Sequence, residues 1–409
     1  CDLVLNGGVT SAIAYPPVAF GLGEAYRFNA IGGASSGAGI AAAVAAAEYR
    51  RRHGSSAGFQ ALAQRTEELA EEVAGRTNLS CLFQPLARHR RLYTAVLRAV
   101  CSPHGWFRVF LVDLVRAYLW ALLIGAALGV AVVAQLSLQI GSQGVVAYVL
   151  AGVVAAGIGL LIALLFDLRA LANDDYGMCD GLTQQPGERH PPLTTWLHGL
   201  IQEAAGRAPD DPPLTFADLH AAPGAPLETL GDHSPEGARS IRLEVIVSNM
   251  TLGEPMRFPR HGSDHPPLYF RPVEMRRLFP RSVVDHLVAH STAVDASVQV
   301  TEPARPCRLC GTAPTIADLR LRTLPHDQLP IVVAARMSVS FPVLFTAVAL
   351  WSKDGRTGRL RRCLMFDGGF CSNFPIHLFD SFVPAWPTFG VALYDLPDTA
   401  KDETASCRY

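Results

Sequence analysis

Charged residues are scarce in this 409-residue chain, at 17% of the sequence against about a quarter in typical soluble domains. Hydrophobic residues reach 49%, so we expect part of the chain to be buried in something other than its own core. The 35 basic and 36 acidic residues nearly cancel, so the charge balance does not indicate nucleic-acid binding. We therefore expect no nucleic-acid partner.

Several common motifs are also missing. The sequence has no Gly-Lys-Ser/Thr phosphate-binding loop and no internal repeat. Its nine cysteines lack a disulfide-scaffold spacing, which fits a reducing compartment. Cys307 and Cys310 have the spacing of half a zinc site, without a second pair nearby. We interpret them as two reduced cysteines, with a zinc completed by His286 or His290 as the alternative.

The longest uncharged stretch of the sequence lies between Arg116 and Asp167. Within it, residues 117–140 and 145–166 are each long enough for a membrane helix of about 20 residues. Gly125 and Gly129 would let the two helices pack closely. The arginines from Arg88 to Arg116 predict that both ends of this hairpin face the cytoplasm, next to anionic headgroups. The alternative is a hairpin buried in a soluble core.

A strand, a sharp turn and an alanine-rich helix follow one another between residues 28 and 49. Residues 28–31 predict the strand, and residues 33–37 fit Gly-x-Ser-x-Gly, the nucleophile elbow. Such a turn strains the backbone of the serine, so its neighbours must be small, as Gly33 and Gly37 are. Ser35 is therefore the candidate nucleophile. Ser36 is the competitor, and a glycine-rich turn without chemistry is the plain alternative.

The first turn of the chain has a similar pattern. Residues 3–5 predict a strand, Gly7 and Gly8 a turn, and residues 12–26 a helix. Two such units in succession predict a βαβα opening with a parallel sheet. Both glycine turns would then lie at the carboxyl edge of the sheet, where α/β proteins build their sites. The N–H groups of Gly7 and Gly8 would suit an oxyanion, or form an ordinary turn.

The remaining pattern predicts one sheet that is interrupted and then completed. Strands are predicted at residues 241–249, 330–335 and 364–366, and helices at 59–74, 196–205 and 283–290. The predicted parts are 1–107 and 241–409 for the catalytic domain, 108–170 for the hairpin and 171–240 for a Pro/Gly-rich insertion. Because the chain begins at Cys1 with a strand-like run, we expect it to be an excised domain.

Asp367 follows an apolar strand and precedes Gly368 and Gly369. A carboxylate at the end of a strand can face the elbow serine across the sheet edge and take the hydroxyl proton as a general base. The alternative is an Asp-Gly turn in which the carboxylate caps its own backbone.

These blocks, in this order, resemble the patatin-like phospholipases. Residues 366–375 (FDGGFCSNFP) look like that family's Asp-Gly-Gly/Ala-x-x-x-Asn-x-Pro block, and residues 338–345 (SVSFPVLF) look like its Ser-x-Ala-x-Pro-x-x-Phe segment. The resemblance covers roughly residues 1–50 and 241–395. It implies a three-layer α/β/α fold with a mainly parallel central sheet, interrupted here by the hairpin.

The resemblance also implies an activity. Ser35 would be the nucleophile and Asp367 the base of a dyad without histidine, and backbone N–H groups of Gly7, Gly8 and Ser36 would form the oxyanion hole. The substrates would be acyl esters of phospholipids, lysophospholipids or neutral lipids, with no metal or cofactor. The family's first turn is usually Gly-Gly-Gly-x-Arg/Lys-Gly, whereas this chain has Asn6, Thr10 and Ser11 at three of those positions.

Two other hypotheses come from different classes. The altered first turn favours a catalytically weak member that serves as a membrane scaffold or lipid-binding module. A conventional Ser-His-Asp esterase would need one of the histidines, for example His286, His290, His326 or His377.

Overall fold

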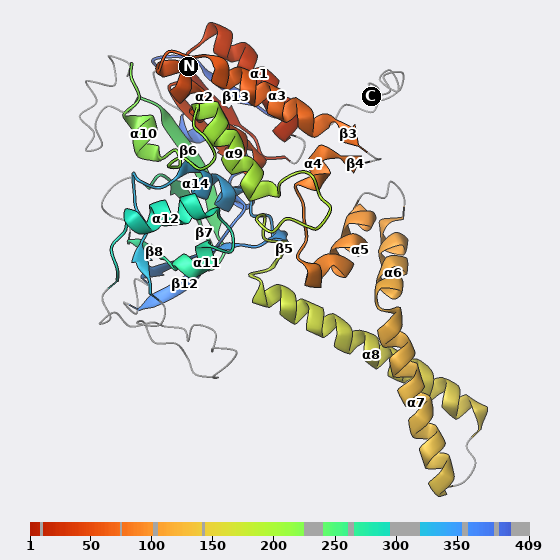
Figure 1. The fold of residues 1–409 in the computed structure, drawn as a ribbon. Helices are drawn as coiled ribbons and strands as arrows, with labels where there is room; N and C mark the ends of the chain where they lie inside the picture. Colours follow the sequence, from red (N-terminus) through yellow and green to blue (C-terminus); the bar gives the residue numbers. More distant parts are fainter. Residues whose placement is uncertain are drawn as a thin grey trace, which may run out of the picture. The chain divides into compact units, whose positions relative to one another are not determined.

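We describe the fold from a computed structural model (Figure 1). It describes residues 1–8, 11–73, 76–100, 105–140, 144–224, 240–260, 266–294, 320–353, 359–379 and 384–393. Thr10, Cys307 and Cys310 lie outside these residues. The chain forms two compact units. The sheet unit comprises Cys1–Phe83, Gly187–Pro342 and Ala347–Tyr409, and the hairpin unit comprises Gln84–Pro186 and Val343–Thr346.

A sheet of nine described strands forms the centre of the sheet unit. The order is β13-β1-β2-β6-β12-β11-β8-β9, with β7 also paired to β6. The strands are β1 (Asp2–Leu5), β2 (Ala30–Ala34), β6 (Arg242–Asn249), β7 (Glu254–Phe258), β8 (Leu268–Phe270), β9 (Arg322–Thr323), β11 (Val348–Lys353), β12 (Leu360–Phe366) and β13 (Thr388–Val391).

The prediction of a mainly parallel sheet is wrong, because the sheet is mixed. Only β13, β1, β2 and β6 are mutually parallel, and the other neighbours pair antiparallel. The reason is the length of the connections. A few residues join β6 to β7 and β11 to β12, and so short a link can connect only antiparallel strands. The α/β class itself is confirmed.

Helices cover one face of the parallel strands. They are α1 (Ser11–Ala25), α2 (Ser36–Arg52), α3 (Ala57–Ala70), α9 (Leu193–Ala205) and α14 (Ile331–Ser338). The other four pack around α2, and Figure 1 shows α2 beside α9. Leu3, Leu5 and Ile31 join the core on this face. On the opposite face, Val4 and Ala30 form a separate buried cluster.

The opposite face of β1 and β2 is also covered by protein. Over β1 and β2 its described cover is the segment around η4 (Ile376–Leu378), whose Phe379 packs on Val4 and Ala30. A Cβ on Gly32 would lie 2.5 Å from the Phe379 ring. Glycine at this position therefore lets β2 pass beneath an aromatic ring. The strand predicted at residues 28–31 is observed as β2, which begins at Ala30 and runs on through Gly32 and Gly33 to Ala34.

Residues 330–335, predicted as a strand, form most of helix α14 instead. The β-branched run Ile331-Val332-Val333 favours a strand by propensity, but every residue of α14 is buried. The helix packs against α2, α9 and β6, so tertiary burial overrides the local preference. Because this segment is a helix, its carboxyl end brings Ser338 to Ser35.

Smaller elements complete the sheet unit. They are β3 (Glu72–Val73), β4 (Arg76–Thr77), α4 (Asn78–Cys81), α10 (Phe216–His220), α11 (Pro272–Met275), α12 (Arg281–Ala289) and η3 (Gly368–Phe370). The helices predicted near residues 59–74, 196–205 and 283–290 correspond to α3, α9 and α12.

The hairpin unit is built on two long apolar helices, α7 (Leu119–Ile140) and α8 (Val145–Asn173). Its other elements are η1 (Ala87–His89), α5 (Arg90–Val100), α6 (Trp106–Ala117), β5 (Gly177–Cys179) and β10 (Val343–Phe345). A Cβ on Gly125 would lie 2.3 Å from the Ala155 carbonyl, and one on Gly129 would lie 2.3 Å from that of Ala151. The predicted close packing at these glycines is confirmed.

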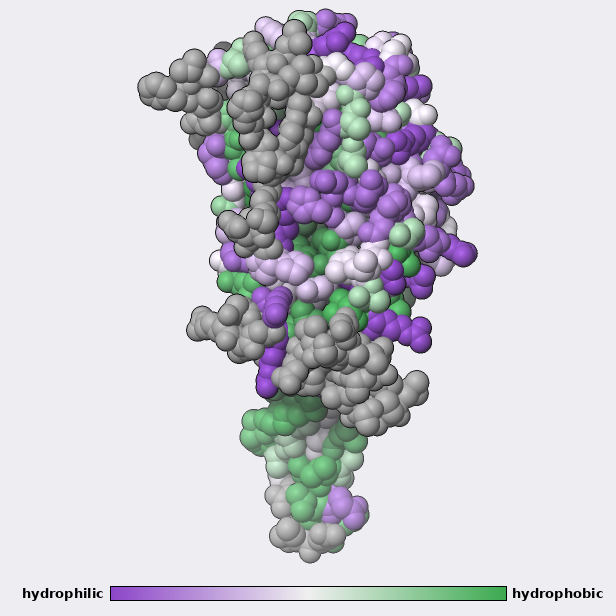
Figure 2. All heavy atoms as spheres, turned by 90° about the vertical axis from the view of Figure 1, so that its left-hand side faces the viewer, coloured by the Kyte–Doolittle hydropathy of each residue, from purple (hydrophilic) through white to green (hydrophobic). Residues whose placement is uncertain are grey.

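The outer surface of this helix pair is apolar. Leu138 is 83% exposed and Val145 78% exposed. Figure 2 shows hydrophobic side chains over much of the visible surface of these helices, at the lower end of the view. By length and composition alone, both helices could cross a membrane.

Candidate active site

Two strands of the sheet end head to head on one edge of β6. On this edge β2 runs parallel to β6 and ends with Ala34 opposite Ile246. β12 runs antiparallel and ends with Phe366 opposite Ser248. The other edge of β6 is occupied by β7 over the same stretch. The carboxyl ends of β2 and β12 therefore point toward each other, one residue of β6 apart.

The next residue along each strand is Ser35 or Asp367, and the structure brings these two together. The Ser35 hydroxyl donates to Asp367 Oδ2 at 2.7 Å, across 332 residues of sequence. The sequence predicted a shared sheet edge formed by parallel strands. The structure reaches the same juxtaposition with an antiparallel β12.

Asp367 is buried and held from two sides. It is 3% exposed, and its Oδ1 accepts the Gly369 N–H at 2.7 Å. Burial raises the pKa of this carboxyl above 3.8, while the hydrogen bonds from Ser35 and Gly369 oppose the shift. A carboxylate with a raised pKa accepts a proton more readily, as a general base must.

Ser35 has the strained backbone of a nucleophile elbow. Its φ is 56° and its ψ is −137°, a conformation that a residue with a side chain rarely adopts. Close backbone contacts enforce the turn. A Cβ on Gly33 would lie 2.6 Å from the Gly37 carbonyl carbon, and a Cβ on Gly37 would lie 2.5 Å from the Asn6 oxygen. The two glycines are therefore a steric requirement of the turn.

Ser338 supports the elbow, a role that the sequence did not reveal. The Ser35 N–H donates to Ser338 Oγ at 2.9 Å, and the Ser338 hydroxyl donates to the Ile246 carbonyl at 2.6 Å. This bridge links the strained residue to β6. A Cβ on Gly368 would lie 2.0 Å from the Ile246 oxygen, so the glycine after Asp367 leaves room for the same junction. Ser338 is the first residue of the block 338–345 that resembles the family, and this resemblance is the sequence feature that could have indicated its role.

Asn373 holds the first turn against the elbow. The Gly7 N–H donates to the Asn373 carbonyl at 3.0 Å, and Asn373 Nδ2 donates to the Gly7 carbonyl at 3.3 Å. A Cβ on Gly7 would lie 2.8 Å from Ser35 Cβ. Gly7 is thus beside the serine, but its N–H already has an acceptor. Asn373 is the asparagine of the Asp-Gly-Gly block, and its role also went unpredicted.

The Ser36 side chain is hydrogen bonded to the backbone of Gly8. The Gly8 N–H donates to Ser36 Oγ at 3.0 Å, and the Ser36 hydroxyl donates to the Gly8 carbonyl. The structure therefore brings Gly7, Gly8 and Ser36 next to Ser35, with both glycine N–H groups donating to protein atoms.

Three of the four candidate histidines, His286, His290 and His326, make their contacts elsewhere. His286 Nε2 is 3.0 Å from the Gln328 carbonyl, His290 Nδ1 is 3.0 Å from the His286 carbonyl, and His326 contacts Asp327. Within the described part of the chain, no histidine is hydrogen bonded to Ser35 or Asp367. The same part of the chain contains no group of three or more His, Cys, Asp or Glu placed to hold a metal ion.

Residues 267–380 match the family model described as patatin-like phospholipase, a range that includes Ser338, Asp367 and Asn373. The chain is 32% identical over 461 aligned residues to the protein named "RpoH suppressor" from Rhizobium meliloti (strain 1021). That alignment covers 98% of this chain and 66% of the relative, so the chain spans only part of that protein's length. Among solved structures, it is similar to VipD from Legionella pneumophila at 15% identity and a TM-score of 0.29, over 99% of this chain and 52% of that chain.

Proposed function

We propose that this chain, which carries a patatin-like phospholipase domain at residues 267–380, is a membrane-associated serine lipid acyl hydrolase. The observation that carries the proposal is the 2.7 Å hydrogen bond from Ser35 Oγ to the buried carboxylate of Asp367. The substrates we propose are acyl esters of phospholipids or lysophospholipids.

The proposed reaction uses Asp367 twice. Asp367 takes the hydroxyl proton while Ser35 Oγ bonds to the ester carbonyl carbon, whose π electrons move onto oxygen. The tetrahedral intermediate collapses, the bond to the alkoxy oxygen breaks, and Asp367 returns its proton to that leaving group. A water molecule then attacks the acyl-enzyme with Asp367 again as base, releasing the fatty acid and restoring Ser35.

The developing oxyanion needs N–H donors. We assign this role to the Gly8 N–H, which a rotation of the Ser36 side chain would release from Ser36 Oγ, and to the Ser36 N–H at the start of α2. The Gly7 N–H is held by the Asn373 carbonyl, so its part is to fix the turn beside Ser35. Losing one such donor typically raises the barrier by about 3 kcal/mol.

The hairpin unit supports the membrane part of the proposal. The apolar outer surfaces of α7 and α8 suit a bilayer, and a cavity of about 440 Å³ lies where the apolar run begins. It is lined by Arg88, Arg91 and Trp120 among others, and the Arg91 guanidinium lies 5.9 Å from the centre of the Trp120 ring. Arginine beside tryptophan is typical of the headgroup level of a membrane. We place this end, and the active site, on the cytoplasmic side.

A second candidate function rests on the first turn. Because the N–H groups of both Gly7 and Gly8 donate to protein atoms, a chain in which this arrangement persisted would bind lipid without hydrolysing it. Such a protein would serve as a lipid-binding module or scaffold.

Probe labelling and turnover test the proposed activity together. A fluorophosphonate should label the wild-type protein and the Ser36→Ala variant, and should fail to label Ser35→Ala. Asp367→Asn should lower kcat on lysophospholipid and on a short-chain nitrophenyl ester by at least about 10³-fold. Asp285→Asn, which changes a half-exposed carboxylate on α12, is the matched control and should keep wild-type kcat.

The outcomes separate the hypotheses. Labelling that persists in Ser35→Ala would show that the nucleophile lies elsewhere. Full activity in Asp367→Asn would exclude the dyad, whereas loss with a single His→Ala would indicate a triad. A folded wild-type protein that binds lipid but turns over neither ester would be the scaffold.

A further inference from the structure

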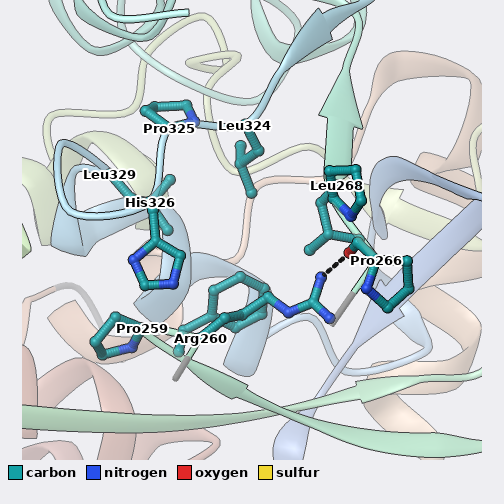
Figure 3. A pocket seen from close by; sticks show the side chains of 10 residues that line it. Pro259, Arg260, Pro266, Leu268, Leu324, Pro325, His326 and Leu329 are labelled. Carbon is teal, nitrogen blue, oxygen red and sulfur yellow. Dashed lines mark hydrogen bonds between the residues drawn. The ribbon is translucent and has the colours of Figure 1, made fainter. Parts of the chain in front are cut away.

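A second cavity lies in the sheet unit, on the edge of β6 opposite the active site (Figure 3). It measures about 270 Å³ and is formed around the end of β7, the start of β8 and the loop after β9. The strand register places its Phe258 opposite Val245, which in turn lies opposite Gly33 of β2. The cavity therefore lies on the far side of β6 from Ser35, and shares no residue with the proposed catalytic site.

The cavity is apolar inside and polar at its mouth. Its buried lining includes Phe258, Leu268 and Leu329, each less than 5% exposed. Arg260 is half-buried, and His326 is exposed. In Figure 3 the Arg260 side chain extends along one side of the hollow, with its guanidinium toward Pro266. An apolar interior with a cation at the opening is complementary to an amphiphile with an anionic end.

Within the described ranges, no acidic side chain pairs with Arg260, although it is half-buried. Its Nη1 donates to the Pro266 carbonyl at 2.6 Å. Among the described residues, no carboxylate lies within ion-pair distance of its guanidinium. Burial lowers the pKa of Arg260, and only the charge of Glu254 opposes that shift. The remaining N–H donors of the guanidinium can bind both oxygens of a carboxylate.

Prolines and a backbone hydrogen bond restrict the walls of the cavity. Four of the ten lining residues are prolines, whose φ angle is locked. The Leu324 N–H donates to the Leu268 carbonyl at 2.7 Å, which joins two sides of the cavity. A preformed apolar cavity avoids the ordering cost that a flexible one would impose on binding.

We propose that this cavity binds the anion of a medium-chain fatty acid, with the alkyl chain inside and the carboxylate on Arg260. Its size sets the chain length. A methylene group occupies roughly 30 Å³, so a cavity of about 270 Å³ suits a medium-length alkyl chain. The site would let the chain sense free fatty acid, and it does not depend on the hydrolase activity proposed above.

Isothermal titration of the full chain in phosphatidylcholine nanodiscs tests this site, with the heat of empty nanodiscs subtracted. The Ser35→Ala background removes any contribution from an acyl-enzyme. From hexanoate to decanoate, each added methylene should tighten binding about fourfold, and hexadecanoate should gain nothing more because the cavity ends. Decan-1-ol, which has no carboxylate, should bind at least about tenfold more weakly than decanoate.

Substitutions of Arg260 distinguish binding of decanoate at this site from partition of decanoate into the lipid of the nanodisc. Arg260→Gln should weaken decanoate binding about tenfold or more, and Arg260→Lys should bind with intermediate affinity. Arg277→Gln, at an exposed arginine on the same unit, is the matched control and should bind as the parent does. Equal binding of decan-1-ol and decanoate, or unchanged affinity in a folded Arg260→Gln variant, would overturn the proposal. If Arg260→Gln fails to fold, Arg260→Lys and the alcohol comparison still decide it.

Discussion

Residues 37–47 of helix α2 and the helix pair α7 and α8 are alike in composition but differ in what surrounds them. All three stretches are rich in alanine, glycine and other apolar residues, whereas the last turn of α2 carries Arg50, Arg51 and Arg52. In α2 every residue from Gly37 to Glu48 is buried, because α1, α3, α9, α14 and the sheet enclose it. In the candidate spans of α7 and α8 only 22% and 11% of residues are buried.

The comparison shows what apolar composition alone leaves undecided. A helix that is hydrophobic all round belongs either in a protein core or in a bilayer. Small residues serve α2 by letting four helices approach it, whereas in the hairpin Gly125 and Gly129 serve a single helix–helix contact. The remaining surface of the hairpin needs an apolar phase from outside the described chain, which we propose is the membrane.

A charge placed in each region should give the largest contrast. Ala43→Arg buries a cation in α2 without a partner and should abolish folding, as judged by near-UV circular dichroism. Leu128→Arg places the charge on a residue that is 61% exposed in α7. It should leave the sheet unit folded but disfavour insertion by about 3 kcal/mol, measured as protein released from vesicles by carbonate.

The control for this pair is Leu128→Ala, which changes the same position without adding a charge and should stay with the vesicles. If Leu128→Arg unfolds the protein as Ala43→Arg does, the hairpin is part of a soluble core and the contrast fails.

Glycine substitutions should sharpen the contrast inside the sheet unit. Gly37→Ala puts a Cβ 2.5 Å from the Asn6 oxygen and should lower the free energy of unfolding by about 1–3 kcal/mol. Gly21→Ala, in α1, meets no atom within 4 Å and should raise it by up to about 1 kcal/mol. Urea denaturation measures both, and equal effects would show that the elbow is not sterically constrained.

The pH dependence should report the burial of Asp367. Because its pKa is raised in the folded state, kcat/KM should fall as the pH drops through a value above 3.8. The folded state binds this proton more tightly than the unfolded state does, so this group lowers stability above its folded pKa. The penalty should disappear as the pH falls toward 3.8.

Unfolding free energies at a series of pH values test that sign. Relative to Asp367→Asn, the wild-type protein should gain stability as the pH falls through this window. A difference that stays constant with pH would show that burial does not perturb this carboxyl.

The smallest expected effect is that of Ser36→Ala. Removing Ser36 Oγ removes an acceptor that competes with the oxyanion for the Gly8 N–H, so kcat should stay within about threefold of the wild type or rise. Steady-state kinetics on a nitrophenyl ester measures it. A loss beyond about tenfold would show instead that the Ser36 hydroxyl organises the first turn for catalysis.

Much of the candidate site was predictable because its requirements are local. A strained turn admits only small neighbours, so Gly33 and Gly37 mark Ser35 in the sequence. Asp367 was predictable from its place after an apolar run and before Gly368 and Gly369. The hairpin was predictable because 50 residues without charge satisfy the length rule for two spans, residues 117–166.

The roles of the supporting residues were not predictable, since they act across the fold. Ser338 and Asn373 stand in the two blocks that resemble the family, but their bonds to Ser35 and Gly7 exist only because α14 and the segment after η3 reach the elbow. Helix α14 itself was mistaken for a strand. Its β-branched residues satisfy both patterns, and only its burial among α2, α9 and β6 selects the helix.

The sequence by itself determined which residues can carry the proposed chemistry and where a long apolar hairpin lies, because backbone strain, side-chain type and uncharged length are properties of short segments. Only the tertiary structure decided that β12 meets β2 head to head on β6, so that a hydroxyl and a carboxylate 332 residues apart lie 2.7 Å from each other. Pairing between distant strands is fixed by the packing of the whole sheet, and no short segment contains that information.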